Sequence, residues 1–144
     1  MQNLGKIFYD ALHASDELME AVGGRIRSTC FEVAPTDQDN TPLPYIIITD
    51  DGMSASETTK DGGWMPLLFR VQAGVEIGAS SPNEVWDLEQ KVMAVIASFV
   101  ESTGEGDVPE LLDGYPQTDG IAWDWTKPCY FDTIRYQCDV NYNH

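Results

Sequence analysis

Basic residues are scarce in this chain of 144 residues: 8 Lys and Arg stand against 24 Asp and Glu, which leaves a formal net charge of −16. Such a charge opposes binding to the phosphate backbone of nucleic acid, so a sequence-reading DNA binder is not expected. The composition also differs from that of a disordered acidic tail, because aromatic and branched residues occur along the whole chain. We therefore expect the acidic residues to lie on the surface of a folded body.

Histidine and cysteine are scarce too, and this limits the chemistry that the chain can perform. Neither His13 nor His144 stands in a pattern that pairs a general base with a nucleophile. Cys30, Cys129 and Cys138 form no close metal-binding pair, and their odd number argues against a disulfide framework. Buried, reduced thiols are the expected state of the three cysteines.

Two further site motifs fail on their spacing. Asp37 and Asp39 resemble the start of a calcium loop, but Pro42 and Ile48 occupy the positions of the required glycine and the closing glutamate. Gly62-Gly63 lacks the Lys-Ser/Thr that follows in a phosphate-binding loop. Adjacent carboxylates are expected by chance among 24 acidic residues. We therefore expect no enzyme, no cofactor and no metal.

No apolar run reaches the roughly 18 residues that cross a bilayer, so no membrane span is expected. The first residues lack the basic flank and the continuous apolar stretch of a signal peptide, which predicts a protein that stays in the cytoplasm. With 42% hydrophobic residues, the chain can form one core and is too short for two ordinary domains. We expect a single domain over 1–144.

Alternating apolar and polar residues predict strands. The clearest alternation covers 67–77, and the same period returns over 134–142. A weaker alternation over 121–125 predicts the hairpin mate of the last strand. Two shorter strands are expected at 25–33 and 45–49, and the second is continuously apolar, as in a strand with both faces covered or one face taken up by a partner.

Helices are expected at the start and in the second half of the chain. Apolar residues recur at helical spacing over 4–12, and Ser15 marks a second, short helical start. Ser81 as a cap, with Glu84 three residues later, predicts a helix over 82–102. The predicted fold class is α+β, with an antiparallel or mixed sheet of about four to five strands packed against two main helices.

The long helix is apolar over more of its surface than one sheet can cover. Its first stripe comprises Val85, Leu88, Val92, Val95, Ile96 and Phe99, and its second comprises Trp86, Met93 and Val100. Together they span about half of the circumference, whereas a helix on one sheet buries roughly 100°. The surplus face needs a neighbour, which is either the first helix of the chain or another subunit.

Two long connections, 50–66 and 101–120, are rich in Gly, Ser, Thr and acidic residues. The second contains Glu101, Glu105, Asp107, Glu110, Asp113 and Asp119, with no Lys or Arg. Loops of this length in a small domain either bind a partner, become ordered on assembly, or remain mobile and solvated.

The order of these elements resembles that of the tail completion and tail terminator proteins of long-tailed phages. The resemblance covers nearly the whole chain and rests on several short motifs. These are Ile7-Phe8-Tyr9-Asp10-Ala11-Leu12, Val22-Gly23-Gly24-Arg25-Ile26, Pro44-Tyr45-Ile46, the helix opening from Ser81 to Glu84, and the closing strand from Ile134 to Val140. The long acidic segment at 101–120 and the sequence Gly74-Val75-Glu76-Ile77 depart from the family pattern.

The resemblance implies a structural protein without catalytic activity. It would form a homo-oligomeric ring, of six copies, at the head-proximal end of the tail tube, where it stops tube growth and joins the tail to the head. Its partners would be further copies of itself, the tail tube protein and the head connector protein. It would be found in the host cytoplasm during assembly and then in the virion tail.

Candidate contact residues follow from the surplus apolar surface. Trp86, Met93 and Val100 of the long helix, with Met53 and Trp64 of the first connection, are the candidates for contacts between subunits. Glu105, Asp107, Glu110 and Asp113 are candidates for an acidic lumen or loop through which DNA would slide without sticking. Trp123 and Trp125 are expected in the core or at a protein interface, because acidic surroundings repel phosphates.

Other classes of function stay open at this point. An acidic domain can mimic DNA and occupy the groove of a basic nucleic-acid-binding partner, which requires a regular double row of carboxylates. The chain can also be another phage or secretion-type assembly subunit. A small enzyme with a carboxylate site would need a concave pocket, which no feature of the sequence predicts.

Overall fold

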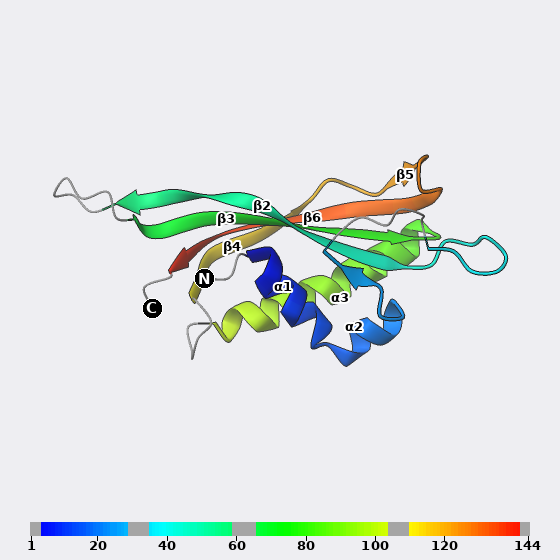
Figure 1. The fold of residues 1–144 in the computed structure, drawn as a ribbon, viewed down its shortest axis with the longest axis horizontal. Coiled ribbons are helices and arrows are strands. Elements are labelled where there is room, and N and C mark those ends of the chain that lie inside the picture. The colour runs from blue at the N-terminus through cyan, green and yellow to red at the C-terminus, as the bar shows by residue number, and fades with distance from the viewer. Residues whose placement is uncertain (1–3, 29–34, 59–65, 104–109, 142–144) are drawn as a thin grey trace.

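A single sheet carries the helices on one of its faces (Figure 1). The computed structural model describes residues 4–28, 35–58, 66–103 and 110–141, and at 53–58, 66–69, 110, 113 and 141 it describes the backbone alone. In chain order the elements are α1 (Leu4–His13), α2 (Asp16–Ala21), β1 (Ile26–Arg27), β2 (Tyr45–Thr58), β3 (Pro66–Ala79), α3 (Pro82–Glu101), β4 (Glu110–Thr118), β5 (Ala122–Asp124) and β6 (Cys129–Asn141). The predicted α+β class is confirmed. Within these ranges there are six strands and three helices, against the four to five strands and two main helices that the sequence predicts.

The sheet is mixed, with strand order β1-β2-β3-β6-β4. β1 runs parallel to β2 through Ile26 opposite Ile46, and all other pairs are antiparallel. β6 pairs with β3 on one side. On its other side, residues 129–131 of β6 pair with β5 and residues 134–141 pair with β4. The hairpin between 121–125 and the last strand is thus confirmed. β4 forms one edge of the described sheet.

β2 and β3 form one long antiparallel pair, so the loop predicted over 50–66 is wrong for 50–58, and 59–65 lie outside the described residues. β2 continues to Thr58 and stays paired with β3 across three register shifts, the first of them between Asp50 and Gly52. Gly52 has a φ of +110°, a backbone conformation that suits glycine. The end of the pair projects beyond the helical layer (Figure 1). Backbone pairing holds a strand of this kind, so its composition can resemble that of a loop.

The second predicted loop, 101–120, also contains a strand. β4 pairs with β6 from Glu110 to Thr118, with a bulge between Leu112 and Tyr115. As an edge strand it needs one apolar face only, and it tolerates Pro116. Its polar composition is therefore that of an edge strand, which the reading as a loop missed.

Two glycines set the path from the first helices into the sheet. α2 ends before Gly23 and Gly24, whose φ angles of 57° and 76° turn the chain back into β1. Arg25 Nε then donates to the Pro44 carbonyl at 2.8 Å, which ties the start of β1 to the start of β2. The strand expected over 25–33 is short, with two residues in β1, and 29–34 lie outside the described residues.

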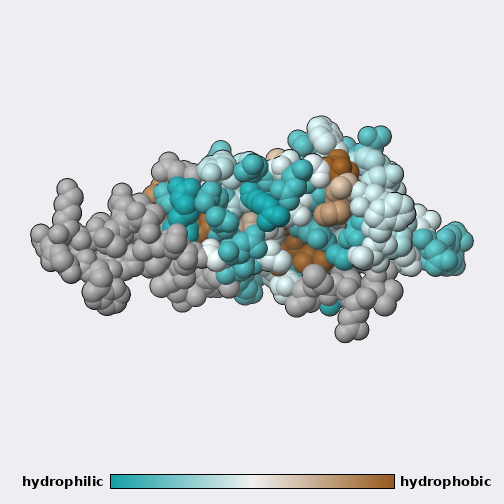
Figure 2. All heavy atoms as spheres, turned by 90° about the horizontal axis from the view of Figure 1, so that it is seen from above, coloured by the Kyte–Doolittle hydropathy of each residue, from teal (hydrophilic) through white to brown (hydrophobic). Residues whose placement is uncertain are grey.

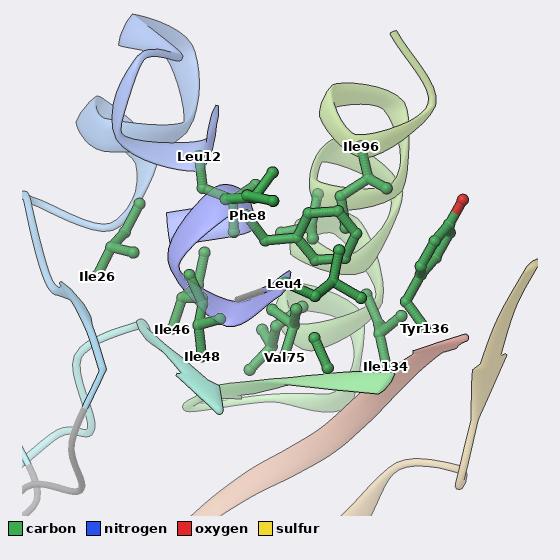
Figure 3. Packing of buried hydrophobic residues seen from close by; sticks show 14 of the residues in the cluster. Leu4, Phe8, Leu12, Ile26, Ile46, Ile48, Val75, Ile96, Ile134 and Tyr136 are labelled. Atoms are coloured by element: carbon green, nitrogen blue, oxygen red, sulfur yellow. The ribbon is translucent and has the colours of Figure 1, made fainter. Parts of the chain in front are cut away.

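The core lies between the helices and the sheet (Figure 3). Leu4, Phe8 and Leu12 of α1 are fully buried, and the Phe8 ring meets Tyr136 of β6 edge to face at 5.1 Å. Such edge-to-face pairs add to the free energy gained by burial alone. The buried residues of the core cluster on β3 and β6 are Val71, Ala73, Val75, Ile77, Ala79, Ile134, Tyr136, Cys138 and Val140, which confirms the predicted alternation.

Capping residues fix the helix starts where the sequence predicts them. Ser81 is the N-cap of α3, and its side chain accepts from Glu84 N at 3.2 Å. Ser15 caps α2 in the same way, accepting from Leu18 N at 3.3 Å. Each cap satisfies a backbone N–H that the helix itself leaves unpaired. The predicted helix over 82–102 ends within one residue of α3.

The face of the sheet turned away from the helices is largely hydrophilic (Figure 2). On this face Tyr45, Ile47 and Cys129 form a small buried cluster. The Tyr45 hydroxyl donates to Glu76 Oε2 at 2.9 Å, and Lys127 Nζ donates to the same oxygen at 2.9 Å. Burial, followed by the charge of Glu76, raises the pKa of Tyr45. This network fixes the turn between β5 and β6 to the strands.

Cys129 and Cys138 are both buried free thiols, as predicted, and Cys30 lies outside the described residues. Burial raises the pKa of Cys138 to about 12, with a further rise from the charge of Asp139. A thiol that stays protonated is a poor nucleophile and a poor metal ligand. These two cysteines are core residues.

Candidate interaction surface

The two flanks of α3 have different neighbours. On one flank, Val95 and Phe99 face α1 and α2 across a valley of about 810 Å³. On the other, Met93 and Val100 face β4 and β6. The first helix therefore does not cover the stripe of Trp86, Met93 and Val100, and this alternative from the sequence is wrong. β4 and β6 cover Met93 and Val100 in part, while Trp86 remains 55% exposed.

A groove of about 240 Å³ runs between α3 and the edge of the sheet. We call it the α3/β4 groove, and its lining residues are Met93, Ile96, Ala97, Val100, Gly114, Pro116 and Tyr136. None of these side chains carries a charge at neutral pH. The valley on the other flank, in contrast, is lined in part by Asp10, Glu17 and Lys91.

Tyr136 and Gly114 shape the floor of the groove. A Cβ at position 114 would overlap the Tyr136 hydroxyl, so the bulge in β4 requires glycine at this point. Burial raises the pKa of Tyr136 to about 12, with a further rise from Cys138, so the phenol keeps its proton. The groove thus combines apolar walls with one neutral hydroxyl, which can donate or accept a hydrogen bond.

The outer edge of β4 borders this groove. Edge strands present backbone N–H and C=O groups that a strand from another chain can pair with. On the same strand, Tyr115 is 49% exposed and its hydroxyl donates to Gln137 Oε1 at 2.8 Å. An apolar groove beside an open strand edge is an arrangement that accepts a second polypeptide.

A second exposed apolar feature lies on the β5–β6 hairpin. Trp125 is 85% exposed and Trp123 is 37% exposed, with ring centroids 6.0 Å apart. Trp123 also packs edge to face on Tyr130 at 4.9 Å. Of the two places that the sequence allows for these residues, the core is wrong for Trp125. Aromatic side chains exposed in this way are enriched at protein interfaces.

Asp124 fixes the turn that carries Trp125. Its Oδ1 accepts from Thr126 N at 2.9 Å, Thr126 Oγ1 at 2.6 Å and Lys127 N at 3.3 Å. The hydrogen bonds from Thr126 lower the pKa of Asp124, and those from Lys127 lower it further. This carboxylate holds a turn together.

The other predicted contact residues lie outside the described ranges or have only their backbone described. Trp64, Glu105 and Asp107 lie outside the described residues. Met53 is in β2 opposite Val71, where its backbone alone is described. Glu110 and Asp113 were assigned to a loop, which is wrong, because both belong to β4; their side chains too are not described.

Five basic side chains of the described residues form ion pairs within the chain. The ion pairs are Lys6–Asp10, Arg70–Asp139, Lys91–Glu17, Lys127–Glu76 and Arg135–Asp119. Because these pairs neutralise basic side chains, the acidic surplus of the chain is left to face solvent.

The described ranges contain no group of three His, Cys, Asp or Glu side chains placed to hold a metal ion. Within the same ranges, none of the helices has both the length and the apolar composition needed to cross a bilayer.

Comparisons with known proteins show similarity at the level of the fold. No protein-family model matches the sequence, and no curated protein matches it either. Among solved structures, the fold is similar to that of a chain in the virion of a native gene transfer agent particle, with a TM-score of 0.51 and 12% sequence identity. The similarity covers 96% of this chain and 95% of that one, so the two share one fold over nearly their whole length.

Proposed function

We propose that this chain is a structural protein of a phage or phage-like virion, and more specifically a tail completion or tail terminator protein. In this role it assembles into a ring, of six copies, at the head-proximal end of the tail tube. It then contacts the tube on one side and the head connector on the other. The role needs no catalysis and no cofactor.

The observation that carries this proposal is the full-length fold similarity to a virion chain. At 96% and 95% coverage, neither chain has a large domain that the other lacks. An agreement over the entire fold is more specific than a shared motif. The family to which the sequence motifs are similar belongs to the same kind of particle.

The α3/β4 groove and the neighbouring β4 edge support assembly with further copies. A contact between two different surfaces of the same chain closes into a ring when the rotation per subunit divides the circle. Copies with a net charge of −16 repel one another, so their contact must form through uncharged surface. The groove, with no charged lining residue, meets this requirement.

The first experiment tests the role itself. The purified protein is imaged by negative-stain electron microscopy at high concentration, alone and mixed with purified tail tubes. The proposal predicts rings that cap one end of each tube and stop further growth. Tubes that stay uncapped and keep growing at saturating protein would contradict it.

The second experiment tests the contact surface with a matched pair of variants. Ala97 and Ala94 are both exposed on α3, one on the groove and one on the valley facing α1 and α2. Arg is a good helix former, so Ala97→Arg and Ala94→Arg should each change the free energy of unfolding by less than about 0.5 kcal/mol.

The two variants should differ in assembly. Ala97→Arg places a cation in the groove and is expected to weaken ring formation at least tenfold in sedimentation or light scattering, whereas Ala94→Arg assembles like the unmodified chain. Equal behaviour of the two variants would exclude the α3/β4 groove as the contact surface, and the tube-capping experiment would still stand on its own.

The DNA-mimic alternative receives no support from the described surface. It requires a regular double row of carboxylates, but on the outer face of the sheet acidic residues alternate with basic partners. These are the pairs Arg70–Asp139, Lys127–Glu76 and Arg135–Asp119. A mixed surface of this kind does not reproduce the charge of a phosphate backbone.

A further inference from the structure

Two carboxyl groups face each other inside the protein, where α3 crosses β6. Glu89 of α3 is 4% exposed and Asp132 of β6 is 2% exposed, and no other charged residues of the described chain are buried to this degree. The two side chains are within hydrogen-bonding reach of each other. Carboxyl groups are almost never fully buried unless they are paired or neutralised.

None of the ion pairs found among the described residues includes Glu89 or Asp132. Asp132 stands opposite Ile77 in the sheet, on the face that carries the core, so β3 contributes apolar neighbours only. From α3, Lys91 Nζ lies 3.9 Å from Glu17 of α2 and is 41% exposed. Arg135 of β6 lies on the outer face and pairs with Asp119.

The remaining titratable neighbours lie on β6 and α3. Tyr130 and Tyr136 share the inner face of β6 with Asp132, and burial raises the pKa of Tyr136 to about 12. On α3, Glu84 accepts from Ser80 Oγ at 2.9 Å, and Asp87 is exposed. Among the described residues, the charge that acts on Glu89 is that of Asp132.

The two carboxyl groups differ in their hydrogen bonds. Asp132 Oδ1 accepts from the backbone N–H of Thr133 at 2.7 Å. As a carboxylate, Glu89 Oε1 would have no donor. A buried oxygen without a partner is costly, whereas a protonated Glu89 donates to Asp132 and removes this cost.

We propose that Glu89 and Asp132 share one proton and form a proton-dependent joint that holds α3 on β6. The joint belongs to the fold of this chain and does not depend on the proposed role in the virion. When the proton is lost, two negative charges meet in the core without a compensating cation. α3 is then held less firmly against the sheet on the side of the α3/β4 groove.

The direction of the pH dependence follows from the proton balance. Burial, then the hydrogen bond and the charge of Asp132, raises the pKa of Glu89 to about 8 from a reference value of 4.5. Between these values the folded chain holds a proton that the unfolded chain has released. Stability contributed by the joint is therefore complete below the lower value, falls as the pH rises, and is lost above about 8.

The test compares Glu89→Gln with the unmodified chain in urea unfolding from pH 5 to pH 9. The amide keeps the size of the side chain and donates to Asp132 at every pH. The unfolding equilibrium constant of the unmodified chain, divided by that of the variant, should rise by up to about tenfold per pH unit and level off above about pH 8. Asp87→Asn, an exposed change two residues away, is the matched control and should give a flat ratio.

A ratio for Glu89→Gln as flat as that for Asp87→Asn would overturn the proposal. So would a rise in stability at pH 8 on adding Ca²⁺ or Mg²⁺, because the pair would then bind a metal ion in place of the proton. If Glu89→Gln fails to fold, ¹³C NMR of the unmodified chain tests the proposal. The carboxyl resonance of Glu89 should then show a protonated group at pH 6.5. An ionised Glu89 at that pH would refute the shared proton.

Discussion

The valley and the groove on the two flanks of α3 show how differently one helix can be covered. Toward α1 and α2, the valley of about 810 Å³ is bordered in part by charged residues. Phe8, Leu12 and Leu18 of these two helices are completely buried. Toward β4, the groove is smaller, about 240 Å³, and none of the residues that line it is charged. The two flanks therefore differ in the chemistry of their surface, and the uncharged flank suits contact with another polypeptide.

The largest expected effect comes from removing a buried ring of α1 from the core. Phe8→Ala removes a fully buried ring that contacts Tyr136 across the core, and it should lower the free energy of unfolding by about 3–5 kcal/mol. Urea unfolding measures this loss. A loss below about 1 kcal/mol would mean that the core under α1 is loosely packed. The flank of α3 toward α1 and the flank toward β4 would then not differ in packing.

A smaller loss of stability is expected when a methyl group is added to the α3/β4 groove from β4. Gly114→Ala places a Cβ against the Tyr136 hydroxyl, so the bulge of β4 or the ring must move, at a cost of about 1–3 kcal/mol. Gly120→Ala is a reference for backbone strain without overlap, because no atom lies within 4 Å of the added Cβ there and its φ of +101° favours glycine. A loss at Gly114 below about 1 kcal/mol would mean that the Tyr136 ring moves aside freely and does not shape the groove.

The smallest effect concerns the helix between the two flanks. Ser81→Ala removes the N-cap of α3 and should cost about 1 kcal/mol in thermal or urea unfolding. Ser98→Ala, an exposed change within the same helix, should be neutral or slightly stabilising, because Ala is the better helix former. If the two changes have the same effect, the cap does not fix the start of α3.

The sequence predicts those elements that bury an apolar face. α3 follows from Ser81 and Glu84, and the alternation in β3 and β6 identifies the strands at the centre of the sheet. The strands at 50–58 and 110–118, where the sequence predicts loops, were missed for one physical reason. Projecting and edge strands are held by backbone pairing, and backbone groups are the same in every residue.

The lining of the α3/β4 groove was predictable in part. The sequence points to Met93 and Val100, but the other wall of the groove comes from β4, where the sequence predicts a loop. The buried pair left a weak signal that was missed. Glu89 interrupts the apolar stripe between Val85 and Val92. Asp132 lies two residues before Ile134 in β6, so both point to the same face of the sheet. That these two meet depends on tertiary packing.

The central position of β6 has a consequence for how the molecule folds. β3 pairs with it on one side and β4 on the other, yet β6 comes after both in the chain. Until β6 is inserted, β3 exposes an apolar strand with an unpaired edge, and β4 has no partner among the described strands. Such species aggregate readily. Damage to β6 should therefore reduce the yield of native protein more than equal damage to β1, which pairs through two residues at the margin of the sheet.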